Sequence, residues 1–112
     1  MASCPPVMAK TSTFRIWIAW DYSDAVRAVR EWCAERGDCY AVNACEYVYS
    51  GGCELGVCVT RINYARFPED PDHIGDRVAK LAEHLSRRLF QKSYSIETPL
   101  ETLYFKVDGP WE

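Results

Sequence analysis

Six cysteines carry the most varied chemistry in this sequence, because a thiolate can bind a metal, form a disulfide or attack a substrate. Four of them follow one another in the pattern Cys39-x5-Cys45-x7-Cys53-x4-Cys58. Structural zinc sites usually hold two cysteines at C-x2-C spacing, with further cysteines or histidines nearby. That spacing does not occur here, and both histidines lie further along the chain. We therefore expect no metal site and interpret the cysteines as reduced thiols that pack in the interior.

Whether Cys45 and Cys58 face each other depends on the turn between the two β-rich runs that carry them. If Gly51-Gly52 forms a two-residue hairpin loop, Cys45 lies opposite Cys58, and a disulfide could join the two strands. If the loop has four residues, the register shifts by two and Cys58 lies opposite Asn43. The N-terminal residues show no signal-peptide pattern. We therefore expect a reducing, cytoplasmic compartment and free thiols.

Four carboxylates form a second cluster around the start of a predicted helix. Acidic residues at a helix N-terminus offset the positive end of the helix dipole, which is the structural interpretation. The functional alternative is an acidic surface that imitates nucleic-acid phosphates and binds a protein complex with a basic surface. The residues of this cluster are Glu69, Asp70, Asp72 and Asp76.

Aromatic side chains form the third group with a potential role in binding. Trp17 alternates with the apolar residues of its predicted strand, so its ring points to the opposite face of the sheet. Tyr47 and Tyr49 lead into the tip of the predicted hairpin. Exposed tryptophan and tyrosine are typical anchors of a protein interface. They predict a contact surface for a partner protein, and the alternative is a homodimer packed sheet to sheet.

A small nucleotide is another candidate ligand, because aromatic stacking and a guanidinium suit a base and a phosphate. The residues that could bind it are Arg61, Arg66 and Tyr64, together with Trp17.

Motifs of nucleophilic or phosphate chemistry are missing from the sequence. It contains no G-x-S-x-G, no P-loop and no G-x-G-x-x-G. The segment after the first predicted strand, Trp20-Asp-Tyr-Ser23, is acidic and would repel a phosphate. We therefore expect no catalytic residue, no cofactor and no enzymatic activity.

Hydrophobic periodicity divides the chain into strands and helices. Aspartates or a serine precede both apolar helical stripes as candidate N-caps, and a glycine follows the first helix. Pro99 interrupts the last extended region, which then forms an edge strand, a bulge or two short strands. The predicted order is a strand at 13–20, a helix up to 37, strands at 39–49 and 53–64, a helix from about 70 to 91, and extended chain at 93–107.

This order predicts a ferredoxin-like βαββαβ sandwich of the α+β class, with two helices on one face of an antiparallel sheet. A fifth strand after Pro99 is an allowed addition. We expect a single domain at 12–108, a flexible tail at 1–11 and a second tail at 109–112.

The bulk properties exclude several functional classes. The 112 residues carry a net charge of −3, which argues against direct binding of nucleic acid, because that normally needs a basic excess. No apolar run approaches the roughly 20 residues that a membrane helix needs, so we expect no membrane partner.

Two short segments, with a helix between them, resemble small uncharacterised proteins encoded by tailed phages and prophages. They are Arg61-Ile-Asn-Tyr-Ala-Arg-Phe-Pro68 and Ser95-Ile-Glu-Thr-Pro-Leu-Glu-Thr102. The resemblance implies a phage-type origin and therefore the cytoplasm of a bacterial host cell, and such proteins include many inhibitors of bacterial defence systems. The expectation is therefore a non-catalytic anti-CRISPR protein that binds a Cas effector complex. The alternatives are a sponge for a cyclic nucleotide and a homodimeric structural module.

Overall fold

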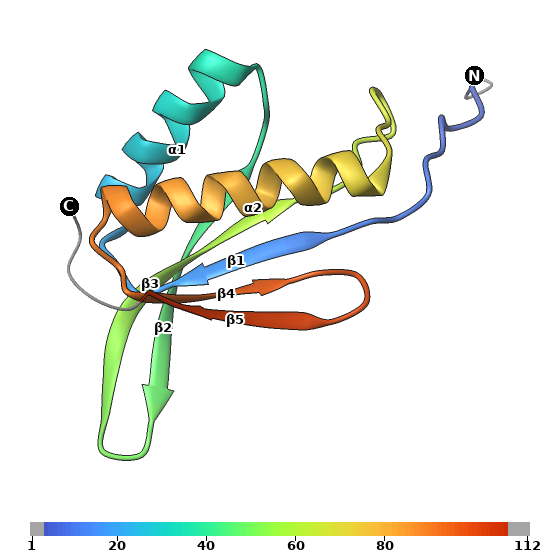
Figure 1. Ribbon diagram of the computed structural model, residues 1–112. Coiled ribbons are helices and arrows are strands. Elements are labelled where there is room, and N and C mark those ends of the chain that lie inside the picture. Colours follow the sequence, from blue (N-terminus) through green and yellow to red (C-terminus); the bar gives the residue numbers. More distant parts are fainter. Residues whose placement is uncertain (1–3, 108–112) are drawn as a thin grey trace.

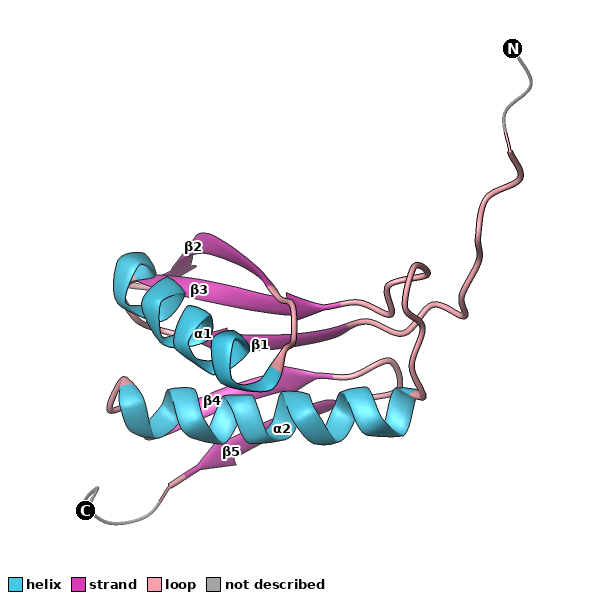
Figure 2. Cartoon of the chain, turned by 90° about the horizontal axis from the view of Figure 1, so that it is seen from above, coloured by secondary structure: helices cyan, strands magenta, loops and turns pink. Residues whose placement is uncertain are grey.

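A five-stranded antiparallel sheet carries both helices on one of its faces (Figures 1 and 2). The computed structural model describes residues 4–107, and the strands lie in the order β2-β3-β1-β4-β5. The predicted ferredoxin-like arrangement is confirmed, and the extra C-terminal strand is present as β5. The elements are β1 (Phe14–Ile18), α1 (Tyr22–Arg36), β2 (Ala41–Tyr49), β3 (Gly52–Arg61), α2 (Pro71–Arg88), β4 (Ser93–Glu97) and β5 (Thr102–Lys106).

The core lies between the helices and the central strands. Alternate residues of β1 are buried, and Phe14, Ile16 and Ile18 point toward the helices. The apolar stripe of α2 covers them, and Ile74, Leu81 and Leu85 are all completely buried. Burial of one such side chain stabilises the fold by about 1.5–3 kcal/mol, so this layer holds the sheet in place.

Both helices begin at the aspartates that the sequence indicates. The Asp21 carboxylate accepts a hydrogen bond from the backbone N–H of Asp24 at 3.1 Å and caps α1. Asp70 caps α2 in the same way, through the backbone N–H of Asp72 at 2.8 Å. The first helix ends at Gly37, whose φ of 67° lies in the left-handed region that glycine adopts without strain.

The β2–β3 hairpin has a different turn from the one expected. Tyr49 pairs with Gly52, so the loop consists of Ser50 and Gly51, and Gly51 has a φ of 92°. Glycine is favoured at a loop position with positive φ, and Gly51 occupies that position. The turn therefore lies one residue earlier than a Gly51-Gly52 loop. Cys58 therefore lies opposite Asn43, and the register that would pair it with Cys45 is wrong.

All six cysteines are free thiols within the described residues. Cys58 is buried, Cys33 and Cys45 are half-buried, and the remaining three are exposed. The interpretation of the cysteines as interior packing thiols is therefore correct for part of the set and wrong for Cys4, Cys39 and Cys53. Residues 4–107 contain no group of three or more histidine, cysteine or acidic side chains placed to hold a metal ion.

The predicted tails fall partly outside the described residues, which exclude 1–3 and 108–112. Of the helices described, none is long and apolar enough to cross a membrane.

Candidate binding site on the open sheet face

Helices cover one face of the sheet, and the side chains on the other face form an aromatic and polar surface. The strand register places one residue from each strand in a row across this face. Trp17 occupies the middle of this row because β1 is the central strand. The row runs Asn43, Cys58, Trp17, Ser95, Tyr104.

Tyr47 reaches across the sheet toward Trp17. Its hydroxyl donates a hydrogen bond to the backbone carbonyl of Ile18 at 3.1 Å, and its ring centroid lies 6.5 Å from that of Trp17 at an interplanar angle of 62°. This edge-to-face geometry is a favourable arrangement of two aromatic rings. Burial, together with the neighbouring Cys45 thiol, raises the pKa of the Tyr47 hydroxyl, so that the group stays protonated and donates at neutral pH.

Gly56 makes this position of Tyr47 possible. A Cβ atom at residue 56 would overlap the Tyr47 ring and would lie 2.8 Å from the carbonyl oxygen of Ile18. Only a residue without a side chain lets the tyrosine cross β3 so closely. The glycine therefore determines where one wall of the surface stands.

A hollow of about 210 Å³ lies between Trp17 and Tyr47. Aromatic residues make up much of its lining, and Glu54 and two serines are polar residues of that lining. Glu54 pairs with Tyr47 across the hairpin, so its carboxylate lies beside the tyrosine. The lining residues are Trp17, Ile18, Ala19, Tyr47, Glu54, Ser93, Tyr94, Ser95 and Tyr104.

An ion pair fixes the indole of Trp17 on the side away from Tyr47. The indole Nε1–H donates to Oε1 of Glu97 at 3.1 Å, and the Arg15 guanidinium donates to Oε2 of the same carboxylate at 3.3 Å. The Arg15 and Glu97 side chains are 41% and 40% exposed, so both remain accessible from solvent. The chemistry of this face suits a flat aromatic group, a cation that rests on a ring, and hydroxyl groups that bind a carboxylate.

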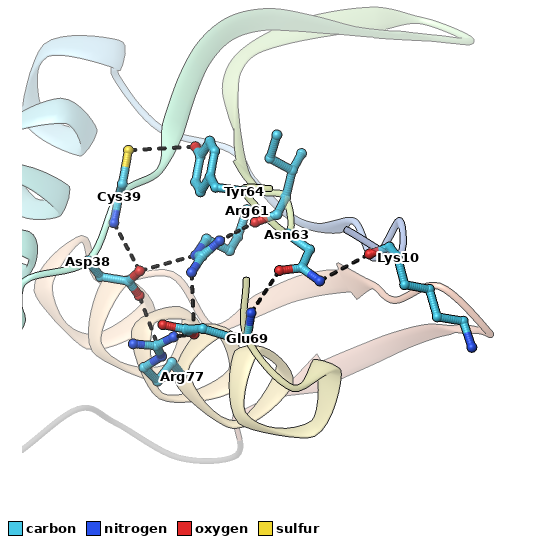
Figure 3. A network of polar contacts seen from close by, with 9 residues as sticks. Lys10, Asp38, Cys39, Arg61, Asn63, Tyr64, Glu69 and Arg77 are labelled. Carbon is cyan, nitrogen blue, oxygen red and sulfur yellow. Dashed lines mark hydrogen bonds and ion pairs between the residues drawn. The ribbon is translucent and has the colours of Figure 1, made fainter. Parts of the chain in front are cut away.

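A second polar cluster is buried at the opposite end of the sheet (Figure 3). The Arg61 guanidinium, only 3% exposed, donates to Asp38 at 3.1 Å and to Glu69 at 3.4 Å. Arg77 of α2 pairs with both of these carboxylates. This ion-pair network joins the segment after α1 to the end of β3 and to α2, and its guanidinium groups are occupied by protein carboxylates.

The pKa of the Asp38 carboxyl group depends on its burial in this network. Burial alone would raise the pKa of its carboxyl group, but hydrogen bonds and the charges of Arg77 and Arg61 outweigh that effect, and the pKa is lowered. Burial also raises the pKa of the nearby Tyr40 hydroxyl, and the Asp38 charge adds to the effect. Asp38 is thus held ionised as a structural anchor.

The structure brings Trp17 and Tyr47 together and separates them from the other residues that the sequence singled out. Tyr49 lies at the hairpin tip with its ring against Gly52. Among the residues of the predicted nucleotide site, Arg61 is buried in the ion-pair network with Tyr64 5.0 Å from its guanidinium, whereas Arg66 lies exposed in the following loop.

The four carboxylates do not share one environment. Glu69 is half-buried and paired with Arg61 and Arg77, and Asp70 caps α2. Asp72 and Asp76 lie on the surface of α2, where both line a groove of about 540 Å³ beside Phe14. Two of the four are thus engaged within the fold.

Sequence reasoning missed Arg15, Glu54, Glu97 and Tyr104 as members of the open-face surface. Alternation along β1 already places Arg15 on the face of Trp17. The other three needed the strand pairing, because Glu54 lies opposite Tyr47 only in the observed hairpin register, and Tyr104 joins the surface only because β5 folds back onto β4.

No protein-family model matches the chain, and no curated protein matches it in sequence. Two solved structures are similar in fold, each with a TM-score of 0.71 and 16% sequence identity. One is a phage SAM lyase in its apo state, and the match covers 88% of this chain and 90% of that one. The other is a phage SAM lyase in complex with S-methyl-5′-thioadenosine, with 96% of this chain and 98% of that one covered.

These matches correct the functional expectation. The matches contradict the prediction of a non-catalytic anti-CRISPR protein, because both structural neighbours are phage SAM lyases. They contradict the prediction of no enzymatic activity in the same way, because a SAM lyase is an enzyme. The implied phage-type origin is supported, because both neighbours are phage proteins.

Proposed function

We propose that this protein binds S-adenosylmethionine (SAM) on its open sheet face and cleaves it as a lyase. The observation that carries the proposal is the hollow between Trp17 and Tyr47, with the Glu54 carboxylate beside it. It occurs in a chain that shares its fold, over nearly its whole length, with a SAM lyase bound to S-methyl-5′-thioadenosine. That ligand is the part of SAM that remains when the four-carbon amino-acid chain leaves.

The groups of the hollow match the adenosyl end of this substrate. An adenine ring can stack on an aromatic side chain, and Trp17 and Tyr47 present their rings to the hollow. Carboxylates accept hydrogen bonds from ribose hydroxyls in other nucleotide sites, and Glu54 is the carboxylate that lines this hollow. The positively charged sulfonium is attracted by the face of an indole, so in the proposed complex it rests on Trp17.

The chemistry explains why a catalytic motif is not needed. A lyase breaks the bond between sulfur and the γ-carbon without water, and the electron pair of that bond moves to sulfur, which becomes a neutral thioether. The γ-carbon then either bonds to the substrate's own carboxylate oxygen, giving a lactone, or the fragment loses a proton from its β-carbon to solvent, giving an alkene. Closure to the lactone needs no protein nucleophile, only binding in the reactive geometry.

Turnover of SAM by the purified protein tests the proposal. We expect liquid chromatography with mass spectrometry to detect S-methyl-5′-thioadenosine, formed together with a four-carbon product. Replacing Glu54 with glutamine removes a charged acceptor, and a hydrogen bond to a charged group contributes about 1.5–3 kcal/mol. We therefore expect Glu54→Gln to lower kcat/KM by about tenfold or more.

The matched control is Glu46→Gln. Glu46 lies on the same hairpin but on the opposite face, paired with Leu55, so this variant should keep its activity. No release of S-methyl-5′-thioadenosine above the spontaneous rate would contradict the proposed lyase activity. Equal loss in the two variants would contradict the role of Glu54 in the hollow.

A further inference from the structure

The Arg15–Glu97 ion pair lies next to the hollow but does not line it. Both residues belong to the row beside that of Trp17, where Arg15 pairs with Glu97 across β1 and β4. Because a strand rises about 3.3 Å per residue, the backbone of Arg15 lies about 7 Å from that of Trp17 and about 13 Å from that of Ala19. An extended ligand whose base lies in the hollow and whose chain crosses the indole of Trp17 could therefore reach Arg15.

Both charged groups have free capacity to bind. Among the described residues, the bond to Glu97 is the one hydrogen bond of the Arg15 side chain, and a guanidinium has five N–H donors. The Glu97 carboxylate is held by the Trp17 indole through Oε1 and by Arg15 through Oε2, and each carboxylate oxygen can accept a second bond. The pair therefore presents a fixed anion and a fixed cation, side by side, to solvent.

We propose that this pair is the subsite for the amino-acid end of the ligand, and this rests on the proposed function. Arg15 binds the α-carboxylate, for which its planar fork is suited, and Glu97 binds the α-ammonium group. The substrate class is thus narrowed to adenosyl compounds that carry a free α-amino acid. S-methyl-5′-thioadenosine lacks that end and would leave the pair unoccupied.

The charges along the face support this orientation. From the hairpin end toward Arg15, the ligand would meet Glu54 with its ribose hydroxyls, the Trp17 ring with its sulfonium, and the ion pair with its zwitterionic end. Each group of the ligand then meets a protein group of complementary character. Lys106 is the other cation that the described strands place on this face, but it lies on the edge strand, opposite Ser93, and does not line the hollow.

A purely structural role predicts a different behaviour. An exposed cross-strand ion pair adds little to stability, so its loss should leave the fold and the hollow intact. Loss of a binding subsite should instead affect ligands according to whether they carry an amino-acid end. This difference separates the two roles.

Calorimetric titration of two probes tests the subsite. S-adenosylhomocysteine carries the amino-acid end without the reactive sulfonium, and S-methyl-5′-thioadenosine has no such end. We expect Arg15→Gln to weaken binding of S-adenosylhomocysteine by about tenfold or more, because a charge-assisted pair is lost, and to leave binding of S-methyl-5′-thioadenosine within about twofold. Lys106→Gln is the matched control and should change neither affinity.

The possible failures can be told apart. If the unmodified protein binds both probes and Arg15→Gln weakens both equally or neither, the subsite is refuted and the proposed function stands. If the unmodified protein binds neither probe, the proposed function is refuted and the subsite with it. Retained binding of S-methyl-5′-thioadenosine by the variant also shows that it is folded.

Discussion

At the scale of single residues, the open face depends on a glycine as much as on the aromatic side chains. Gly56 leaves room for Tyr47 to cross β3 and to donate to the carbonyl of Ile18. Trp17 is fixed from the other side by Glu97. The two rings are therefore held before a ligand arrives, which lowers the entropic cost of binding.

Substitution of Gly56 by alanine tests this arrangement. The added methyl group would overlap the Tyr47 ring and crowd the Ile18 carbonyl, and such overpacking costs about 1–3 kcal/mol. We expect Gly56→Ala to lower the free energy of unfolding in urea by that amount and to abolish binding of S-methyl-5′-thioadenosine.

A glycine on the helix side serves as the control for that substitution. A Cβ atom at Gly75 of α2 would meet the Phe14 ring at 3.3 Å, and alanine favours helix formation, so Gly75→Ala should be close to neutral and should keep ligand binding. If Gly56→Ala had the stability and affinity of the unmodified protein, the proposed position of Tyr47 would be incorrect.

At the scale of elements, the ion-pair network around Arg61 joins α2 to the sheet. Asp38 follows α1, Arg61 ends β3 and Arg77 belongs to α2, so three segments that are distant in sequence meet through charged groups that are largely buried (Figure 3). Removing one member of a buried ion pair is destabilising, because the charge that remains loses a partner that compensated its burial. This network therefore supports the fold at a distance from the proposed ligand.

The lowered pKa of Asp38 predicts that the stability of the fold depends on pH. Its folded-state pKa lies below the unfolded value of about 4, so the folded state binds fewer protons than the unfolded state between these two values. The resulting stabilisation is fully present above pH 4 and is lost as the pH falls through the lowered pKa. Urea unfolding between pH 7 and pH 3 should therefore show a stability that falls on the acid side.

Asp38→Asn should remove this contribution. We expect the variant to lose about 3 kcal/mol at pH 7, the lower end of the range for a broken buried pair because Glu69 still pairs with Arg61, and to show a flatter profile below pH 4. Glu83→Gln, at an exposed i,i+4 pair with Arg87, is the control and should cost less than about 0.5 kcal/mol. A similar acid-side slope in Asp38→Asn and in the unmodified protein would refute this role for Asp38.

At the scale of the whole molecule, one face of the sheet is closed by helices and the other is open. The β2–β3 hairpin extends beyond the helices (Figure 1) and exposes Val48 and Leu55, which are 79% and 68% accessible. Exposed apolar side chains on a projecting hairpin suit contact with another protein. The homodimer anticipated from the sequence remains a prediction, as does location in the host cytoplasm.

The sequence predicted much of this architecture because local signals and the final packing agree. Alternation in β1 identified the buried face and the position of Trp17, and the helix caps were found at Asp21 and Asp70. The hairpin register was not determined, because three consecutive small residues, Ser50 to Gly52, allow more than one turn. Glu54 could not be assigned to the site without that register.

The expectation of a non-catalytic protein fails for a chemical reason. Missing nucleophile and phosphate motifs do not exclude catalysis, because in the proposed reaction the substrate carries its own leaving group and its own nucleophile. The signals that remained in the sequence were Trp17 and Tyr47, which indicated binding on the open face. Which ligand they bind depends on groups from all five strands, and strand order does not follow from periodicity alone.

A crystal structure of the protein with S-methyl-5′-thioadenosine would show whether the open face binds the ligand. We expect the ligand on that face, with its base or sulfur against the Trp17 ring and its ribose hydroxyls on Glu54. Ligand bound instead on the helix side, for example in the groove beside Phe14 and Asp76, would contradict it. So would a complete absence of binding by a protein shown to be folded.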